Sequence, residues 1–382
     1  MDSGNKLFLL DAYALIYRAY YAFIKNPRIN SKGFNTSAIL GFVNTLEEVL
    51  KKENPTHIGV AFDPAGPTFR HEAFEQYKAQ REETPEAIRL SVPIIKDIIR
   101  AYRIPILEVA GYEADDVIGT LATEAGRQGI TTYMMTPDKD YGQLVSDKVF
   151  MYRPKHTGGF EVMGVEEVKA KFDIQSPTQV IDMLGLMGDS SDNIPGCPGV
   201  GEKTAQKLVS EFGSIENLLE HTDQLKGALK TKVETNREMI TFSKFLATIK
   251  IDVPIQLEMD ALVREEADEN SLRSIFEELE FRTLIDRVLK KDISGNGITS
   301  ATGSKVATGK SAPSPLPLFP EEGGAIQGDL FANFTGNEAG EAKKSNLETL
   351  ETLNCNYQLI DTEKKRSEII QKLLTSKILS LD

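Results

Sequence analysis

Three short apolar stretches, each rich in β-prone residues and each ending at an acid, limit the folds that this chain can adopt. They are residues 6–10 before Asp11, 57–62 before Asp63, and 131–136 before Pro137 and Asp138. Between them lie segments with helical apolar spacing, such as 36–52 and 113–129. This alternation predicts an α/β domain with a parallel sheet and right-handed crossovers. Because such sheets bind ligands at the carboxyl ends of their strands, the three acids should meet at one edge.

The pattern changes along the rest of the chain. From about residue 176 to 291, short helical segments alternate with glycine-rich turns, which predicts an all-helical module after an α/β domain at 1–175. Residues 292–345 are rich in Gly, Ser, Ala, Thr and Pro, so we expect a flexible linker there. A strand-helix-strand pattern in 346–382 stops at Asp382, which we interpret as the start of a further domain.

Charge and cysteine content narrow the class of protein. The 382 residues carry a formal net charge of −13, but residues 1–250 hold 29 basic against 34 acidic side chains. Nine of those acids belong to the candidate site below, so nucleic acid is not excluded as a partner. Cys197 and Cys355 fit neither a disulfide framework nor a CxxC metal site, which favours the cytoplasm. Asp11 and Arg18 interrupt the apolar N-terminus, so we expect no membrane span.

Two further groups of acids join the strand-end aspartates. The run GYEADDVIGT opens a predicted helix, where acids also stabilise the helix dipole, so capping is an equal explanation for that group alone. PDKDYGQLV and GDSSDNIPG place more acids just after a strand and in a loop before the helical module. The candidate metal ligands are Asp11, Asp63, Glu113, Asp115, Asp116, Asp138, Asp140, Asp189 and Asp192.

Nine carboxylates in one place repel each other and destabilise a fold unless cations offset them. Ligands that are all oxygen select Mg²⁺ or Mn²⁺ over Zn²⁺. Two such ions stabilise both the attacking and the leaving oxygen in the hydrolysis of a phosphodiester. The scattered histidines suggest ordinary packing or surface roles (His57, His71, His156 and His221).

Basic and glycine-rich segments suggest nucleic-acid contacts. In FRHEAFEQYKAQREETPEAI, the spacing of Arg70, Tyr77, Lys78 and Arg81 fits one side of a helix, although a solvated amphipathic helix gives the same pattern. Residues 193–203 contain three glycines whose N–H groups could approach phosphates at a helix N-terminus. A Walker A loop is excluded, because Glu202 separates the last glycine from the lysine and no strand precedes the loop. The glycines are Gly196, Gly199 and Gly201, and a basic track, which solubilising surface lysines would equally explain, runs over Lys203, Lys207, Lys226, Lys230 and Lys232.

Over about residues 5–290, the runs GYEADDVIGTLA, TPDKDYGQLV and LGLMGDSSDNIPGCPGVGEKTAQKLVSEFGS resemble the 5′ nuclease domains of bacterial DNA polymerases I, relatives of the flap endonucleases. The resemblance implies a PIN-like α/β domain followed by a helix-hairpin-helix (H3TH) module, with all nine acids at metal-site positions. It implies two or more Mg²⁺ or Mn²⁺ ions, catalytic roles for Asp116 and Asp138, and K⁺ at the helix-hairpin-helix turn.

The same resemblance assigns contacts to DNA. Residues 66–100 would form a helical arch around the 5′ end of the cut strand, with Lys78 and Arg81 over the scissile phosphate. Arg18, Arg70 and Tyr77 would contact the substrate as well. The glycine-rich turn, with Lys203 and Lys207, would grip the duplex backbone.

The activity implied is 5′-3′ exonuclease and 5′-flap cleavage of DNA and of RNA primers, in replication and repair at the bacterial nucleoid. A PIN-type ribonuclease would not need the helix-hairpin-helix grip, and a noncatalytic DNA-binding module would have lost some of the nine acids. Residues 346–382 resemble the opening of a proofreading 3′-5′ exonuclease domain. Residues Gln327 to Phe331 (QGDLF) resemble a sliding-clamp peptide, although such short matches also arise by chance.

Overall fold

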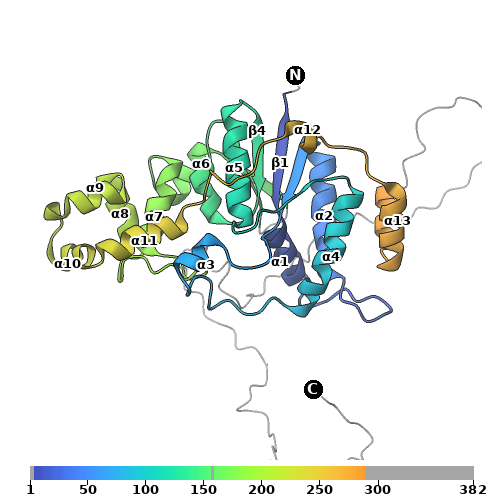
Figure 1. The fold of residues 1–382 in the computed structure, drawn as a ribbon, viewed down its shortest axis with the longest axis horizontal. Coiled ribbons are helices and arrows are strands. Elements are labelled where there is room, and N and C mark those ends of the chain that lie inside the picture. Colours follow the sequence, from blue (N-terminus) through green and yellow to red (C-terminus); the bar gives the residue numbers. More distant parts are fainter. Residues whose placement is uncertain (1–3, 156–158, 290–382) are drawn as a thin grey trace, which may run out of the picture. The chain divides into compact units, whose positions relative to one another are not determined.

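The computed structural model describes residues 4–155 and 159–289 (Figure 1). Its centre is a six-stranded sheet with the strand order β3-β2-β1-β4-β5-β6. The first five strands pair in parallel and β6 pairs antiparallel with β5. The strands are β1 (Lys6–Asp11), β2 (His57–Ala61), β3 (Ile106–Leu107), β4 (Thr131–Met135), β5 (Val149–Pro154) and β6 (Phe160–Met163).

The predicted α/β fold is confirmed, and the three predicted strands correspond to β1, β2 and β4, which lie side by side. The sheet is parallel as predicted except at β6, which pairs antiparallel with β5. Only five residues separate β5 from β6, and a parallel connection needs a crossover of about a dozen residues or more. The chain therefore returns antiparallel, and β6 is the last strand on that side of the sheet.

Helices cover both faces of the sheet. Alternate residues of β1 point to opposite faces, so each set packs against a different group of helices. Phe8 and Leu10 lie in a core with α1 (Ala12–Ala22), α2 (Ser37–Lys52) and α4 (Glu86–Ala101). Leu7 and Leu9 lie in a second core with α5 (Ala114–Arg127). All four residues are fully buried, so both faces of the sheet are covered at its centre, and the ends of the central strands remain for a site.

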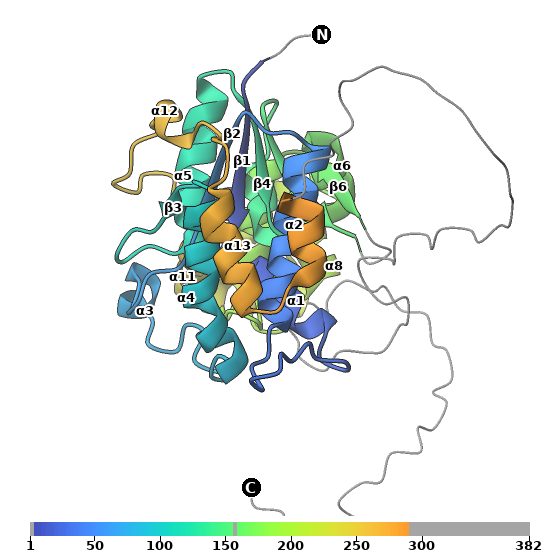
Figure 2. The same ribbon diagram turned by 90° about the vertical axis from the view of Figure 1, so that its right-hand side faces the viewer.

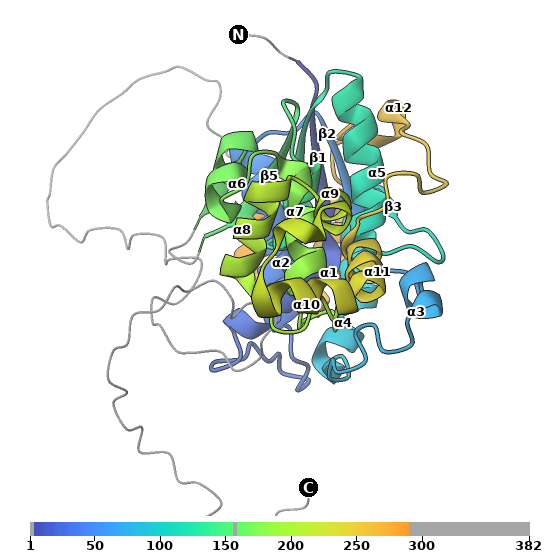
Figure 3. The ribbon, with the colours of Figure 1, turned by 90° about the vertical axis from the view of Figure 1, so that its left-hand side faces the viewer.

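The predicted all-helical module is confirmed, and Figure 3 shows its helices in front of the sheet. Its buried residues continue the core of α5, so the two parts share one apolar interior. The helices are α7 (Val180–Met187), α8 (Glu202–Phe212), α9 (Ile215–Glu220), α10 (Gly227–Thr235) and α11 (Arg237–Ala247). The remaining helical segments up to α10 are α3 (Phe69–Ala73), α6 (Val165–Phe172), η1 (Lys139–Leu144), η2 (Pro177–Gln179) and η3 (Thr222–Gln224).

After α11 the chain returns to the α/β domain, which the sequence did not indicate. Val263 pairs with His57 at the start of β2, and the helix α13 (Glu269–Glu278) lies against α4 (Figure 2). Its residues Leu272 and Phe276 are fully buried in the same core as α2 and α4. The other segments of this return are α12 (Met259–Leu262), α14 (Arg282–Leu284) and a π-helical turn, η4 (Ile285–Leu289).

The helix expected to present Arg70, Tyr77, Lys78 and Arg81 on one side does not form. The helix α3 ends at Ala73, α4 begins at Glu86, and Lys78 between them adopts a left-handed backbone with φ of 56°. We call residues 74–85 the gateway segment. The predicted linker at 292–345, the predicted domain at 346–382 and the QGDLF peptide lie outside the described residues. No helix in the described part combines the length and apolar character of a membrane span.

Replacing Phe276 by alanine tests the return of α13. Phe276 is 0% exposed, so we expect the free energy of unfolding to fall by about 3–5 kcal/mol in urea denaturation. Phe245→Ala is the control, because Phe245 is 40% exposed and should give a smaller loss. Equal losses from the two changes would show that α13 does not contribute a buried core.

Candidate metal centre and nucleic-acid interface

Three of the expected acids lie where central strands end. Asp11 is the last residue of β1, Asp63 follows β2 by two residues, and Asp138 follows β4 by three. Because β2, β1 and β4 are neighbours in the sheet, the three carboxylates lie at one edge. Burial, and then the negative charges of Asp63 and Asp138, raise the pKa of Asp11 to about 7.

The start of α5 brings a second group of acids to this edge. Glu113 is the N-cap residue, and Asp115 and Asp116 lie in the first turn. Asp63 Oδ1 accepts the backbone N–H of Ala114 at 2.7 Å, which ties the helix start to the end of β2. Glu113 and Asp116 also form a reciprocal capping box, so these acids both cap the helix and face the site.

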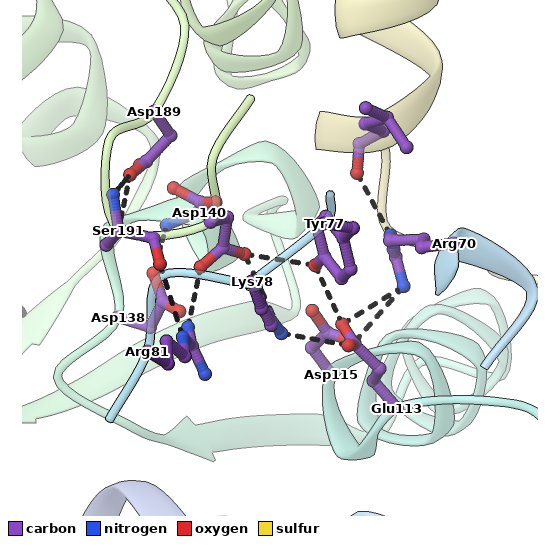
Figure 4. Close-up of polar contacts among 12 residues, drawn as sticks. Arg70, Tyr77, Lys78, Arg81, Glu113, Asp115, Asp138, Asp140, Asp189 and Ser191 are labelled. Carbon is purple, nitrogen blue, oxygen red and sulfur yellow. Dashed lines mark hydrogen bonds and ion pairs between the residues drawn. The ribbon is translucent and has the colours of Figure 1, made fainter. Parts of the chain in front are cut away.

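The third group comes from η1 and from the loop at 188–196. The backbone N–H of Asp140 donates to Asp138 Oδ1 at 2.9 Å. Asp189 and Ile194 close the loop with two backbone hydrogen bonds of 3.0 and 2.8 Å, and Asp192 lies between them. Figure 4 shows Asp138, Asp140 and Asp189 close to the basic groups described next.

Two cations from the gateway segment point into the acids (Figure 4). Lys78 Nζ lies 2.9 Å from Glu113 Oε1 and 3.7 Å from Asp192 Oδ2. Arg81 Nη2 lies 2.6 Å from Asp192 Oδ1. Burial opposes ionisation of Glu113 and Asp192, but the charge of Lys78, with Arg70 at Glu113 and Arg81 at Asp192, lowers the pKa of both carboxyls.

Backbone and amide hydrogen bonds fasten the gateway segment to the loop at 188–196. The N–H of Lys78 donates to the carbonyl of Asp192 at 3.0 Å. Gln80 Nε2 donates to the carbonyl of Ser190 at 2.5 Å, and Asn193 Nδ2 donates to the carbonyl of Gln76 at 2.7 Å. The segment that carries Lys78 and Arg81 is therefore positioned by the same loop that carries Asp189 and Asp192.

Two carboxylates keep buried oxygens that lack a hydrogen-bond partner in the described structure, Oδ1 of Asp115 and Oδ1 of Asp140. Burial, followed by the charges of Asp116 and Asp138 respectively, raises the pKa of these two acids well above the ordinary range. Buried oxygens without partners beside other acids suit a hard cation. As the side chains lie, no three described carboxylates surround one point closely enough to hold an ion.

Arg70 and Tyr77 do not lie where the sequence analysis expected them. Arg70 is 1% exposed and Tyr77 is 2% exposed. Tyr77 Oη lies 3.1 Å from Glu113 Oε2 and 3.0 Å from Asp192 Oδ2, and Arg70 pairs with Asp116 at 2.8 Å. Both polar groups are buried and engaged inside the protein, and their expected contact with DNA stays a prediction.

The hydrogen bonding of Gly196 also differs from that expected for a phosphate contact. Its N–H donates to Ser243 Oγ at 2.9 Å, so it is not available to a phosphate. Gly196 has φ of 63°, and a Cβ at this position would lie 2.3 Å from the nitrogen of Gly188. This glycine therefore allows the 188–196 loop to close on itself, which holds Asp189 and Asp192 in place.

The other expected nucleic-acid contacts lie nearer the surface. Gly199, Gly201, Lys203 and Lys207 are exposed around the start of α8. Lys232 donates to the carbonyl of Gly199 at 3.2 Å. Arg18 on α1 is half-buried, and burial lowers its pKa while the charge of Glu48 acts in the opposite direction. Contacts of these residues with DNA stay predictions.

Two residues at the site were not predicted from the sequence. Lys139 Nζ lies 2.7 Å from Asp189 Oδ2, and its position between Asp138 and Asp140 in the sequence was a sufficient signal. Tyr141 is 1% exposed, and its hydroxyl has no hydrogen-bond partner in the described structure. Nothing in the local sequence separates such a tyrosine from an ordinary core aromatic.

Two family models match the chain. The N-terminal resolvase-like domain of 5′-3′ exonucleases matches residues 6–173, and their C-terminal SAM-fold domain matches residues 175–270. The chain belongs to the 5′-3′ exonuclease family. DNA polymerase I of Bacillus caldotenax is 42% identical over 287 residues, 74% of this chain and 32% of that protein. The chain thus spans about a third of the length of such relatives.

Solved structures with the same fold include two nucleases. T5 5′-exonuclease with bound divalent metal ions (zinc) is 22% identical, with a TM-score of 0.53 over 72% of this chain and 99% of that one. The catalytic core of Rad2 in complex with DNA substrate is 18% identical, with a TM-score of 0.52 over 75% of this chain and 93% of that one. At these identities the likeness shows the fold alone.

The raised pKa of Asp11 predicts how the metal-free protein responds to pH. Because folding raises this pKa from 3.8 to about 7, the folded state favours the protonated acid. This contribution to stability is complete below about pH 4 and is lost as the pH rises through 7. In EDTA, Asp11→Asn should therefore raise the melting temperature more at pH 8 than at pH 5. The exposed-site control Asp147→Asn should show no such difference; an equal effect of Asp11→Asn at both pH values would contradict the prediction.

Proposed function

We propose that the chain hydrolyses phosphodiester bonds at 5′ ends and 5′ flaps of DNA with the help of two or more divalent cations. The main support is the edge of the sheet where acids from three strand ends, a helix start and a loop lie beside Lys78 and Arg81. Asp115 and Asp140 each keep a buried oxygen with no hydrogen-bond partner in the described structure, which favours a cation there. Mg²⁺ or Mn²⁺ suits the all-oxygen ligands best.

Bound ions of this kind would supply an activated water and stabilise the charge on the leaving oxygen. Asp11, Asp63, Glu113, Asp115 and Asp138 would hold one side of the site. Asp140, Asp189 and Asp192 would hold the other side, toward the helical module. Lys139, now paired with Asp189, would have to yield part of that contact to a cation.

Lys78 and Arg81 fit a role at the scissile phosphate. Both side chains pair with site carboxylates in the metal-free protein. A cation that takes Glu113 or Asp192 as a ligand would compete with these pairs and free the two basic groups. A phosphate at the site would then gain cationic donors where negative charge develops during hydrolysis.

The glycine-rich turn before α8 supports a grip on duplex DNA without sequence reading. Gly199 and Gly201 are exposed there, and the backbone N–H groups at the helix start would favour an anion. Glu202 in the first turn weakens that field, so Lys203 and Lys207 would carry much of the attraction. K⁺ at the turn would compete with Lys232 for the carbonyl of Gly199.

The relatives named DNA polymerase I, together with the neighbour solved with DNA substrate, favour this function over a ribonuclease or a noncatalytic module. All nine acids are present, and the helical module lies beside the site. The proposal extends to the removal of RNA primers, to excision repair and to work at the nucleoid in the cytoplasm. It also includes attachment to a sliding clamp through Gln327 to Phe331. The domain boundaries at residues 175 and 291 are part of the same proposal.

Cleavage of an end-labelled 5′-flap duplex tests the reaction, beside plain single strand and blunt duplex, in Mg²⁺ and in EDTA. We expect Mg²⁺-dependent cutting at the junction, reduced by Asp138→Asn by at least about 100-fold, because loss of even an outer-sphere partner costs about 10–100-fold. Asp147→Asn is the matched control and should cut like the parent. Indiscriminate cutting of single strands would favour the ribonuclease, and flap binding without cutting the noncatalytic module.

Lys78→Ala separates the two roles of this lysine. We expect the single-turnover rate to fall by about 100-fold or more, as when a group that stabilises developing charge is lost. We also expect DNA-free protein to bind Mn²⁺ more tightly in calorimetry, because the ion pair with Glu113 no longer competes. Arg89→Ala on the exposed side of α4 should change neither quantity. Weaker Mn²⁺ binding by Lys78→Ala would refute the competition.

A further inference from the structure

Arg70 is a fully buried cation whose donors are all engaged. Its Nε donates to the carbonyl of Leu246 at 2.9 Å, and its Nη2 donates to the carbonyl of Thr248 at 2.9 Å. Nη1 and Nη2 each donate to one oxygen of Asp116 at 2.8 Å, and Nη1 also lies 3.3 Å from Glu113 Oε2. The guanidinium has five N–H donors, and five acceptors meet them.

The carboxylate of Asp116 also has all of its hydrogen-bond positions occupied. It is 0% exposed. Besides the two bonds from Arg70, its Oδ1 accepts the N–H of Lys250 at 2.7 Å and its Oδ2 accepts the N–H of Glu113 at 3.1 Å. A carboxylate has about four lone-pair positions, and all four are used here. Asp115, one residue away, instead keeps an oxygen without a hydrogen-bond partner in the described structure.

The pair joins three segments that build the site. Arg70 lies in α3, which leads directly into the gateway segment with Lys78 and Arg81. Asp116 lies in the first turn of α5, next to Asp115 and three residues after the N-cap Glu113. The carbonyls of Leu246 and Thr248 belong to the end of α11 and the turn after it, in the helical module.

We propose that Arg70 and Asp116 form a positioning pair, in which Asp116 is not a metal ligand but holds Arg70, and Arg70 sets the spacing of the Glu113 and Asp115 carboxylates. This inference rests on the proposed function. It revises the sequence-based assignment of Asp116 to the metal and of Arg70 to DNA. A lysine at position 70 keeps the charge but loses the planar fork that binds both oxygens of Asp116.

The test measures Mn²⁺ binding to DNA-free protein by calorimetry for Arg70→Lys, Asp116→Asn and the double variant. We expect each single change to weaken binding by about 10–100-fold without changing the number of ions bound, as for loss of an outer-sphere partner. The double variant should bind Mn²⁺ with an affinity no lower than that of the single variant with the lower affinity, because both changes break the same interaction. The control Asp115→Asn removes a ligand and should lower the number of ions.

Loss of a buried charge can prevent folding, so a fourth variant keeps the test decisive. Arg70→Met with Asp116→Leu removes both charges together, and apolar replacement of a buried ion pair is often neutral for stability. This variant should fold, bind the same number of Mn²⁺ ions, and bind them more weakly.

Three outcomes would overturn the inference: fewer ions bound by Asp116→Asn, additive losses in the double variant, or parent-like affinity in all pair variants. They are distinct from failure of the proposed function, in which the parent itself would bind no Mn²⁺ and cut no flap.

Discussion

Repulsion among buried carboxylates is the constraint on which the site depends. Asp11, Asp115 and Asp140 have raised pKa values because burial and neighbouring acids both oppose their ionisation. The protein offsets part of this charge with its own cations, Lys78, Arg81 and Lys139. The rest remains as oxygens of Asp115 and Asp140 that have no hydrogen-bond partner among the described residues. Under the proposed function, these oxygens would attract divalent ions to this edge of the sheet.

Two of these cations, Lys78 and Arg81, connect the site to the gateway segment. Lys78 and Arg81 belong to the gateway segment, and the loop that carries Asp192 fastens that segment by one backbone hydrogen bond and by side-chain hydrogen bonds of Gln80 and Asn193. Binding of ions at Glu113 or Asp192 would therefore change contacts of the gateway segment without any contact to DNA. Under the proposed function, ion binding by the acids and the positions of Lys78 and Arg81 would therefore depend on each other.

Burial separates acids that look alike in sequence. Asp115 and Asp116 are adjacent, yet Asp115 keeps an oxygen without a hydrogen-bond partner in the described structure, whereas Asp116 accepts four hydrogen bonds. The difference comes from the helix itself, since neighbouring residues on α5 point about 100° apart. One side chain faces the sheet edge, and the other faces Arg70 and the turn after α11.

The sequence by itself determined the α/β class, the strands β1, β2 and β4 with their terminal acids, the all-helical module and its family. Local patterns were enough there, because apolar periodicity and acids at strand ends are properties of short segments. Only the tertiary structure decided the antiparallel β6, the return of α13, the non-helical gateway segment, and the burial of Arg70, Tyr77 and Gly196. Each of these depends on contacts between residues far apart in the chain, such as Arg70 with Leu246 or Gly196 with Ser243. The spacing of residues within one segment carries no information about such contacts.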